Sequence, residues 1–145
     1  MPYAVTLPNG HEVSDSSARL DMAAVHDMLA GTAWAAGRPR ALTERAAANC
    51  LCFGLYAPDG AQAGFARVVT DRTFRAHLAD VVIQPGARGL GLGTALVAAV
   101  LAHPELATVT HWTLTTADAH GLYARFGFQR GAGDDGWMTL DRTQR

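Results

Sequence analysis

Four glycines lie between a strand-like and a helix-like segment in residues 81–104, VVIQPGARGLGLGTALVAAVLAHP. Gly86, Gly89, Gly91 and Gly93 follow an apolar run and lead directly into a run rich in alanine and leucine. A chain that turns through glycine into a helix directs successive backbone N–H groups, and the positive end of the helix dipole, toward one place. The segment therefore predicts a strand, an anion-binding loop and a helix in that order.

Two common phosphate-binding loops do not fit this glycine pattern. A P-loop needs Lys followed by Ser or Thr after its last glycine, whereas Leu92 and Gly93 follow Gly91. The dinucleotide fingerprint needs a glycine at its sixth position, which is Thr94 when counted from Gly89. It also needs an acidic residue about 20 residues further on, and none stands there. Neither an NTPase nor a Rossmann reading is supported.

The composition limits the classes of protein that the chain can belong to. With 145 residues, 49% hydrophobic and 17% charged, the chain is expected to form a single domain over residues 1–145. A net charge of -1 argues against nucleic-acid partners and anionic membranes. No apolar run approaches the roughly 18 residues of a membrane span, so a cytoplasmic location is expected. Cys50 and Cys52 are too few for a zinc site, and no metal is expected.

The order of the expected elements indicates a mixed α/β fold. Residues 3–7 form a strand, and helices follow within 19–34, with Asp21 as N-cap, and over 42–48. An Asp-Gly pair predicts a hairpin between the runs 51–58 and 61–71. Strands over 75–84 and 110–116 flank a helix over 92–102, so the two strands are expected to be parallel. A short helix over 118–126 and a final hairpin complete a sheet of six or seven strands, with helices on both faces.

Two motifs in this order are similar to those of one enzyme family. Residues 88–93, RGLGLG, match the pattern of Arg or Gln, two residues, Gly, one residue, and Gly or Ala. Residues 123–128, YARFGF, match a second signature with Ala119 at its preceding small position. The chain thereby resembles the GNAT family of acetyl-CoA-dependent N-acyltransferases over nearly its whole length. The resemblance implies the GNAT fold and an N-acetyltransferase that moves an acetyl group from acetyl-CoA to a primary amine of a small molecule or peptide.

The resemblance also implies which residues would contact acetyl-CoA. Backbone groups of the glycine loop would hold the pyrophosphate, and main-chain groups of Val81 and Ile83 would hold the pantetheine arm as if it were a further strand. Thr116 stands where the second signature often has Asn. The expected loop contacts are Arg88, Gly89, Leu90, Gly91, Leu92, Gly93 and Thr94.

Three residues are candidates for catalysis. Tyr123 occupies the position of the family's usual acid for the leaving sulfur. His77 is the first candidate for the base, because strict alternation would place it on the same strand face as Val81 and Ile83, and an imidazole titrates near neutrality. Asp80 is the alternative base on the opposite face. A lone acid in an apolar strand needs a partner, so Asp80 can instead pair with Arg67 or Arg75.

The amine acceptor is expected near the first two helices, where Trp34 and Arg38 are candidate contacts. Trp34 can equally be a core anchor, and Arg38 can simply face water. The sequence leaves the acceptor's identity open, and it leaves both a monomer and a homodimer open. An alternative function is a CoA-binding regulator or degenerate acyltransferase without amine turnover. A toxin that acetylates a macromolecule such as tRNA would need a basic face, which the net charge argues against.

Overall fold

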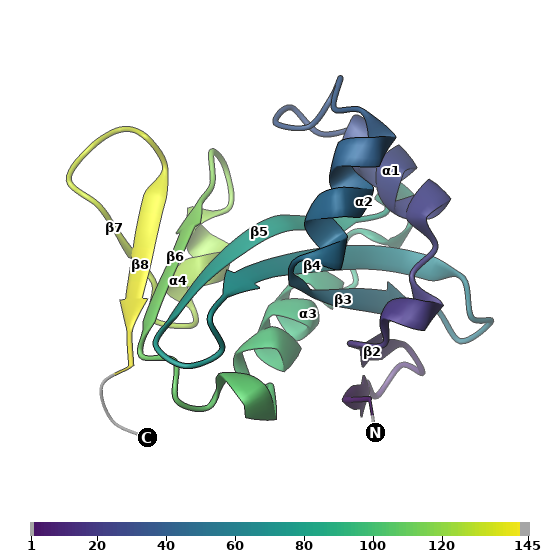
Figure 1. The fold of residues 1–145 in the computed structure, drawn as a ribbon, viewed down its shortest axis with the longest axis horizontal. Coiled ribbons are helices and arrows are strands. Elements are labelled where there is room, and N and C mark those ends of the chain that lie inside the picture. Colours follow the sequence, from purple (N-terminus) through teal and green to yellow (C-terminus); the bar gives the residue numbers. More distant parts are fainter. Residues whose placement is uncertain (1, 143–145) are drawn as a thin grey trace.

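The computed structural model describes residues 2–142 and contains one mixed sheet with helices on both faces (Figure 1). Its strand order is β1-β2-β3-β4-β5-β6-β8-β7, with β5 and β6 parallel and the other neighbouring strands antiparallel. The predicted fold class is confirmed. The strands are β1 (Ala4–Thr6), β2 (Glu12–Ser14), β3 (Leu51–Tyr56), β4 (Gln62–Thr70), β5 (Arg75–Ile83), β6 (His111–Thr115), β7 (Gln129–Arg130) and β8 (Trp137–Asp141).

The described residues form eight strands, so the expected six or seven was too low. The strand that the sequence did not reveal is β2, which has three residues. It pairs antiparallel with both β1 and β3, and its central residue, Val13, is fully buried. Three residues are too few for alternation of apolar and polar side chains to be recognised in a sequence.

Four α-helices pack on the sheet: α1 (Met22–Ala30), α2 (Arg40–Ala48), α3 (Leu92–Leu101) and α4 (His120–Ala124). Short 3-10 turns occupy Ser17–Arg19, Pro85–Ala87 and Pro104–Leu106. The Asp21 side chain accepts a hydrogen bond from the Ala24 N–H at 3.1 Å, which confirms it as the N-cap of α1. Within residues 2–142, no helix has the length and apolar character needed to cross a membrane.

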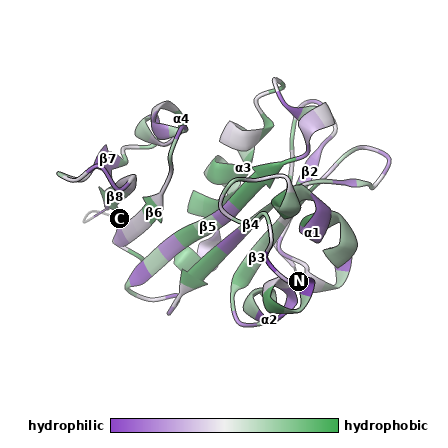
Figure 2. Ribbon diagram, turned by 90° about the horizontal axis from the view of Figure 1, so that it is seen from above, coloured by the Kyte–Doolittle hydropathy of each residue, from purple (hydrophilic) through white to green (hydrophobic). Residues whose placement is uncertain are grey.

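The sheet separates two hydrophobic cores. The larger core packs α3 and α4 against one face of the strands, and the smaller packs α1 against the other, with Ala47 of α2 at its edge. Green apolar stretches follow α3 and the central strands in Figure 2. Side chains of the larger core include Phe53, Leu78, Leu96, Val100, Trp112, Leu114 and Tyr123, and those of the smaller core include Val25, Met28, Leu29, Cys52, Phe65 and Val82.

Strands β5 and β6 pair over only three residues and then separate. The parallel register joins residues 75–77 to residues 111–113 and ends at the pair His77 and Thr113. Beyond it β6 pairs with β8 up to Thr115, so β6 and β8 turn away from β5 together (Figures 1 and 2). The second half of β5 consequently has an edge without a neighbouring strand.

A bulge in β5 changes which side chains share a face. The register with β4 shifts between the pairs Phe65–Val82 and Arg67–Ala79, and Asp80 takes a left-handed conformation with φ 54°. Leu78 therefore packs in the larger core and Val82 in the smaller one, although unbroken alternation would put both on one face. The expectation that His77 shares a face with Val81 and Ile83 is wrong for this reason. Val81 and Ile83 lie on the α3 face, and His77 lies on the α1 face.

Candidate active site

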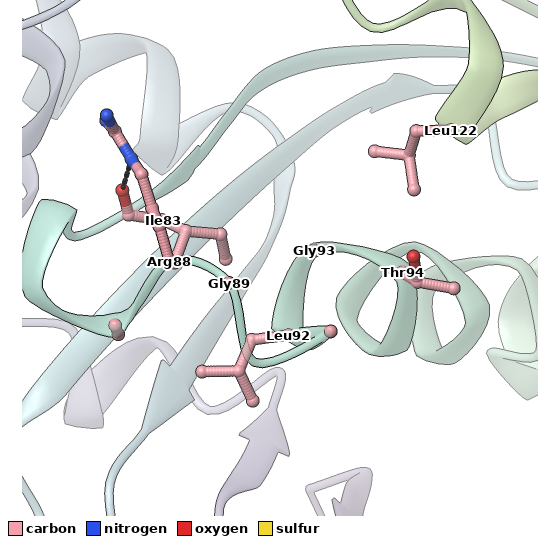
Figure 3. A pocket seen from close by; sticks show the side chains of 9 residues that line it. Ile83, Arg88, Gly89, Leu92, Gly93, Thr94 and Leu122 are labelled. Carbon is pink, nitrogen blue, oxygen red and sulfur yellow. Dashed lines mark hydrogen bonds between the residues drawn. The ribbon is translucent and has the colours of Figure 1, made fainter.

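A hollow of about 230 Å³ opens where the end of β5, the glycine loop and α4 meet (Figure 3). Leu122 of α4 lies across this hollow from the start of α3. The hollow is at the end of β5 that has no pairing with β6. Its lining residues are Ile83, Ala87, Arg88, Gly89, Gly91, Leu92, Gly93, Thr94 and Leu122.

The glycine loop adopts a conformation that needs glycine and leaves its surface open. Gly89 and Gly91 have φ of 82° and 74°, where other residues are strained. No heavy atom lies within 4 Å of a Cβ built on either residue. Gly91 is the N-cap of α3, and the first helical hydrogen bond runs from the Ala95 N–H to the Gly91 carbonyl. The N–H groups of residues 92–94 precede that bond and remain available for an anion.

Gly93 lies within α3, where a glycine costs about 1 kcal/mol relative to alanine. A Cβ on Gly93 would lie 3.9 Å from Ile83 Cγ1 and 3.9 Å from Leu122 Cδ2, which is ordinary van der Waals contact. The packing of the protein therefore does not require a glycine at this position. What the missing side chain provides is space in the hollow.

Most of the predicted cofactor contacts lie together, but three do not line the hollow. Leu90 is 61% exposed, and Val81 packs against the larger core. The Thr116 hydroxyl accepts a hydrogen bond from the Ala119 N–H at 3.0 Å, so it organises the turn before α4. Two lining residues, Ala87 and Leu122, were not anticipated. Both are next to predicted residues in the sequence. Their side chains are apolar, so nothing in the sequence marked them as ligand contacts.

Arg88 is folded back onto the strand that precedes it. Its Nε donates a hydrogen bond to the Ile83 carbonyl oxygen at 3.2 Å, as Figure 3 shows. Arg88 lines the hollow, but Figure 3 shows its guanidinium directed away from the start of α3. It would have to leave the Ile83 carbonyl to meet an anion at that helix end.

Tyr123, the first residue of the second signature, is buried. Its side chain is 7% exposed, and its ring meets Phe128 in an edge-on contact with centroids 6.0 Å apart. Burial, with a smaller contribution from the charge of Asp118, raises the pKa of Tyr123 to about 12. The phenol is therefore protonated at neutral pH, so it can act as a proton donor but not as a base.

His77 lies on the other face of β5, near the point where β5 and β6 part. Its Nδ1 is 2.7 Å from the Thr113 hydroxyl oxygen, and its ring contacts that of Trp137 at 5.4 Å between centroids. Burial and then the charge of Arg67 lower the pKa of His77 below its usual 6.5. The imidazole is consequently neutral at pH 7 and can accept a proton.

Asp80 is the centre of a buried polar cluster at the bulge. One carboxylate oxygen accepts from Trp34 Nε1 at 3.2 Å and from Arg38 Nη2 at 3.2 Å. The other accepts from Arg38 Nη1 at 2.8 Å and from Arg67 Nε at 3.0 Å. The sequence-based alternative that Asp80 pairs with Arg67 is confirmed. Its partnership with the loop residues Trp34 and Arg38 had no signal in the sequence.

The hydrogen bonds to Asp80 make it a poor proton acceptor. Burial alone would raise the pKa of Asp80, but the hydrogen bonds and charges of Arg38 and Arg67 outweigh it, and the pKa is lowered. Four donors also occupy its two oxygens. Asp80 therefore joins the loop between α1 and α2 to the bulge and does not present a free base.

A second cluster, Asp15, His103 and Glu105, has potential ligand atoms within 4.8 Å of one another. Asp15 and His103 Nε2 are in contact at 2.7 Å, and the Glu105 N–H donates to His103 Nδ1 at 3.0 Å. Both ring nitrogens are thus already engaged. The cluster ties the N-terminal hairpin to the end of α3.

We predict that Asp80→Asn lowers the free energy of unfolding at pH 7 by about 2–4 kcal/mol, because it leaves two partly buried guanidinium groups without their counter-charge. The pKa of Asp80 is lowered in the folded state, so its stabilisation is present above the unfolded pKa of about 3.9 and is lost as the pH falls through the folded pKa. The deficit should therefore shrink in acid. Urea unfolding at pH 7 and at lower pH measures it.

The exposed pair Arg40–Glu44 provides the control. Glu44→Gln should change stability by no more than about 0.5 kcal/mol at either pH. A deficit for Asp80→Asn as small as that of the control would show that the cluster does not stabilise the bulge.

Comparison with known proteins gives one family. Residues 48–130 match the acetyltransferase (GNAT) domain family. A solved structure of a protein assigned to the GNAT family, from Xanthomonas campestris, is 42% identical with a TM-score of 0.79, and the match covers 91% of this chain and 88% of that one. A curated relative, the uncharacterized N-acetyltransferase ycf52 of Pyropia yezoensis, is 36% identical over 66 residues. That match spans 45% of this chain and only 38% of the relative.

More distant structures share the fold. A GNAT acetyltransferase from Elizabethkingia anophelis, solved with acetyl-CoA bound, has a TM-score of 0.69 at 10% identity and covers 92% of this chain and 99% of its own. N-acetylglutamate synthase from Neisseria gonorrhoeae, solved with coenzyme A and N-acetyl-glutamate, has a TM-score of 0.71 at 13% identity over 99% of this chain and 36% of its own. The glycine loop, the parted strands and these matches together establish that the chain belongs to the GNAT family of acetyltransferases.

Proposed function

We propose that the chain is an acetyl-CoA-dependent N-acetyltransferase that moves the acetyl group to a primary amine of a small molecule or peptide, by direct attack in a ternary complex. One observation carries the proposal: the glycine loop opens beside the edge of β5 that β6 leaves unpaired. Such an edge offers backbone hydrogen-bonding groups to a ligand that carries amides. The loop beside it offers N–H groups to a pyrophosphate. Acetyl-CoA carries both features.

The residues around the hollow suit the two ends of this substrate. The N–H groups at the start of α3 and Arg88 would hold the phosphates, and the main chain near Val81 and Ile83 would hold the pantetheine arm. The thioester would then lie in the gap between β5 and β6, and a backbone N–H of β5 would stabilise the oxyanion formed during transfer. Two structures that share the fold were solved with acetyl-CoA or coenzyme A bound, which supports acetyl-CoA as the co-substrate.

Tyr123 and His77 would divide the proton transfers. The neutral imidazole of His77 would take a proton from the acceptor ammonium, which as a free alkylamine has a pKa near 10.4. The amine nitrogen would then attack the thioester carbon, and the C–S bond would break as the amide forms. The Tyr123 hydroxyl would donate its proton to the departing sulfur, so that coenzyme A leaves as its thiol, and the phenolate would recover a proton from the nitrogen as the neutral amide forms. His77 lies on β5 where the gap begins, and Tyr123 lies on α4, next to Leu122, which lines the hollow.

Binding of acetyl-CoA should depend on the space at Gly93. We expect Gly93→Leu to weaken acetyl-CoA by about tenfold or more, because the added side chain enters the hollow. Gly93→Ala should bind nearly as the parent does, and it should be more stable by about 0.5–1 kcal/mol. Calorimetric titration with acetyl-CoA, with NAD and ATP as control ligands, measures the affinity. Equal affinities for all three proteins would mean that the hollow does not hold the coenzyme.

Tyr123→Phe should lower turnover by one to three orders of magnitude, roughly the range for loss of a general acid. The dissociation constant of acetyl-CoA should barely change, because the phenyl ring keeps its packing. Thiol release in the presence of an amine panel gives the rate. Unchanged turnover would remove Tyr123 from the mechanism. No thiol release by the parent protein, despite tight binding of acetyl-CoA, would favour the alternative of a CoA-binding regulator.

A base with a lowered pKa should determine the acidic side of the dependence of kcat/KM on pH. If His77 is the base, kcat/KM rises with pH and levels off above an apparent pKa below 6.5, since the imidazole must be neutral to accept a proton. His77→Gln should remove this limb and lower the plateau by about 10²-fold or more. A profile in His77→Gln that keeps the same limb would assign the titration to another group.

A further inference from the structure

Two exposed tryptophans mark the ends of a strip on the α1 face of the sheet. Trp34, in the loop after α1, is 57% exposed, and Trp137, at the start of β8, is 42% exposed. Trp34 donates to Asp80, and the Trp137 ring packs on His77, so both side chains adjoin β5. Large aromatic side chains exposed near a reactive site are typical of surfaces that bind a ligand.

The floor between the two tryptophans carries a net positive charge. Arg38 and Arg67 share the single carboxylate of Asp80, which leaves one charge uncompensated. His77, the next titratable group along the strip, is neutral at pH 7 because its pKa is lowered by burial and by Arg67. A partly buried positive charge favours an anionic ligand, and guanidinium geometry suits a carboxylate.

Arg67 has hydrogen-bonding capacity left over. Its side chain is 17% exposed. Its Nε donates to Asp80, and its Nη1 lies 3.5 Å from Cys50 Sγ. Its Nη2 makes no hydrogen bond to the residues between 2 and 142. This donor is not closed off from solvent, so the carboxylate of a ligand can replace water as its acceptor.

The acidic groups at the Trp137 end of the strip are exposed, so they offset the positive charge near Arg67 only weakly. Asp134 and Asp135 lie in the exposed loop before Trp137, and one Asp135 oxygen already accepts from the Trp137 N–H at 3.1 Å. Exposed charges are screened by water and salt much more than the half-buried Arg67 is. They leave the region around Arg67 cationic.

The strip continues into an open groove of about 460 Å³ beyond His77. The groove gives the body of an acceptor room well beyond a simple alkylamine. Its lining includes exposed Val69, and it extends to the start of β5 and β6.

We propose that the acceptor is an amine bearing one carboxylate and an aromatic or large apolar side chain, as an aromatic α-amino acid does. The carboxylate would pair with Arg67, and the side chain would pack against the exposed tryptophans. A single negative charge matches the single uncompensated positive charge, whereas a phosphate dianion would exceed it. The part of this inference that concerns the reaction rests on the proposed acetyl transfer. The predicted preference for binding a carboxylate does not depend on it.

The test uses matched probes that differ in the carboxylate. With coenzyme A present, N-acetyl-L-phenylalanine should bind at least about tenfold more tightly than N-acetylphenethylamine in calorimetric titration. In thiol-release assays, L-phenylalanine should exceed both phenethylamine and L-alanine in kcat/KM by about tenfold or more. Equal affinities for the two acetylated probes would overturn the inference, as would preference for a phosphorylated amine.

Variants with opposite expected effects separate recognition from simple damage. Arg67→Met should remove the preference for the carboxylate probe, while Asp80→Asn, which raises the cluster charge to two, should increase it. Trp34→Ala should weaken both acetylated probes alike. Arg40→Gln, which changes an exposed arginine of α2, is the control and should leave the preference unchanged. Preference lost in both Arg67→Met and Asp80→Asn would overturn the role of charge.

The same experiments separate this inference from the proposed reaction. A clear binding preference without thiol release from any amine would refute amine turnover and would still support a carboxylate-binding strip. Thiol release at equal kcat/KM for L-phenylalanine and phenethylamine would support amine turnover. It would refute the proposal that the strip recognises the acceptor's carboxylate.

Discussion

The separation of β5 from β6 is the constraint on which the rest of the site depends. A buried strand edge without a partner is unfavourable, because its N–H and C=O groups lose water and gain no hydrogen bond. The parting begins just after His77, and the bulge at Asp80 follows within three residues. The glycine loop then opens beside the free edge. The geometry is understandable if a ligand with amide groups completes the sheet.

The bulge divides β5 into two functional halves. Before Asp80 the side chain of His77 faces α1, and after it Val81 and Ile83 face α3. A strand without a bulge would place these three side chains together on one face. The proposed coenzyme site and the proposed acceptor site can therefore lie on opposite faces of one strand and meet at the gap. The left-handed backbone of Asp80 is itself unfavourable, and the four hydrogen bonds to its carboxylate offset that strain.

The parts of the fold that sequence reasoning recovered are those with local signals. Asp21 caps α1 as its position predicts, and the glycines at 89 and 91 have the left-handed conformations that only glycine adopts easily. The bulge was missed as a definite feature because Asp80 in an apolar run looks like any strand residue. Asp80 is the bulge residue that puts His77 on a different face from Val81 and Ile83. Its carboxylate is held by Arg38 and Arg67, which are distant in the sequence, so no local pattern indicates the bulge.

The saturation of Asp80 also explains how charge is distributed over the site. A carboxylate already held by Arg38, Arg67 and Trp34 cannot neutralise an incoming ammonium, so the cluster repels a simple cationic amine. An amine bound in the proposed acceptor site would lose its proton more easily, because a positive neighbour lowers an amine's pKa. Such an environment favours the nucleophilic form at the expense of affinity. A carboxylate on the acceptor would restore that affinity by pairing with the cluster, and it would also cancel the charge that lowers the amine's pKa. The removal of the proton would then depend on the base at His77, so that recognition and proton transfer rest on different residues.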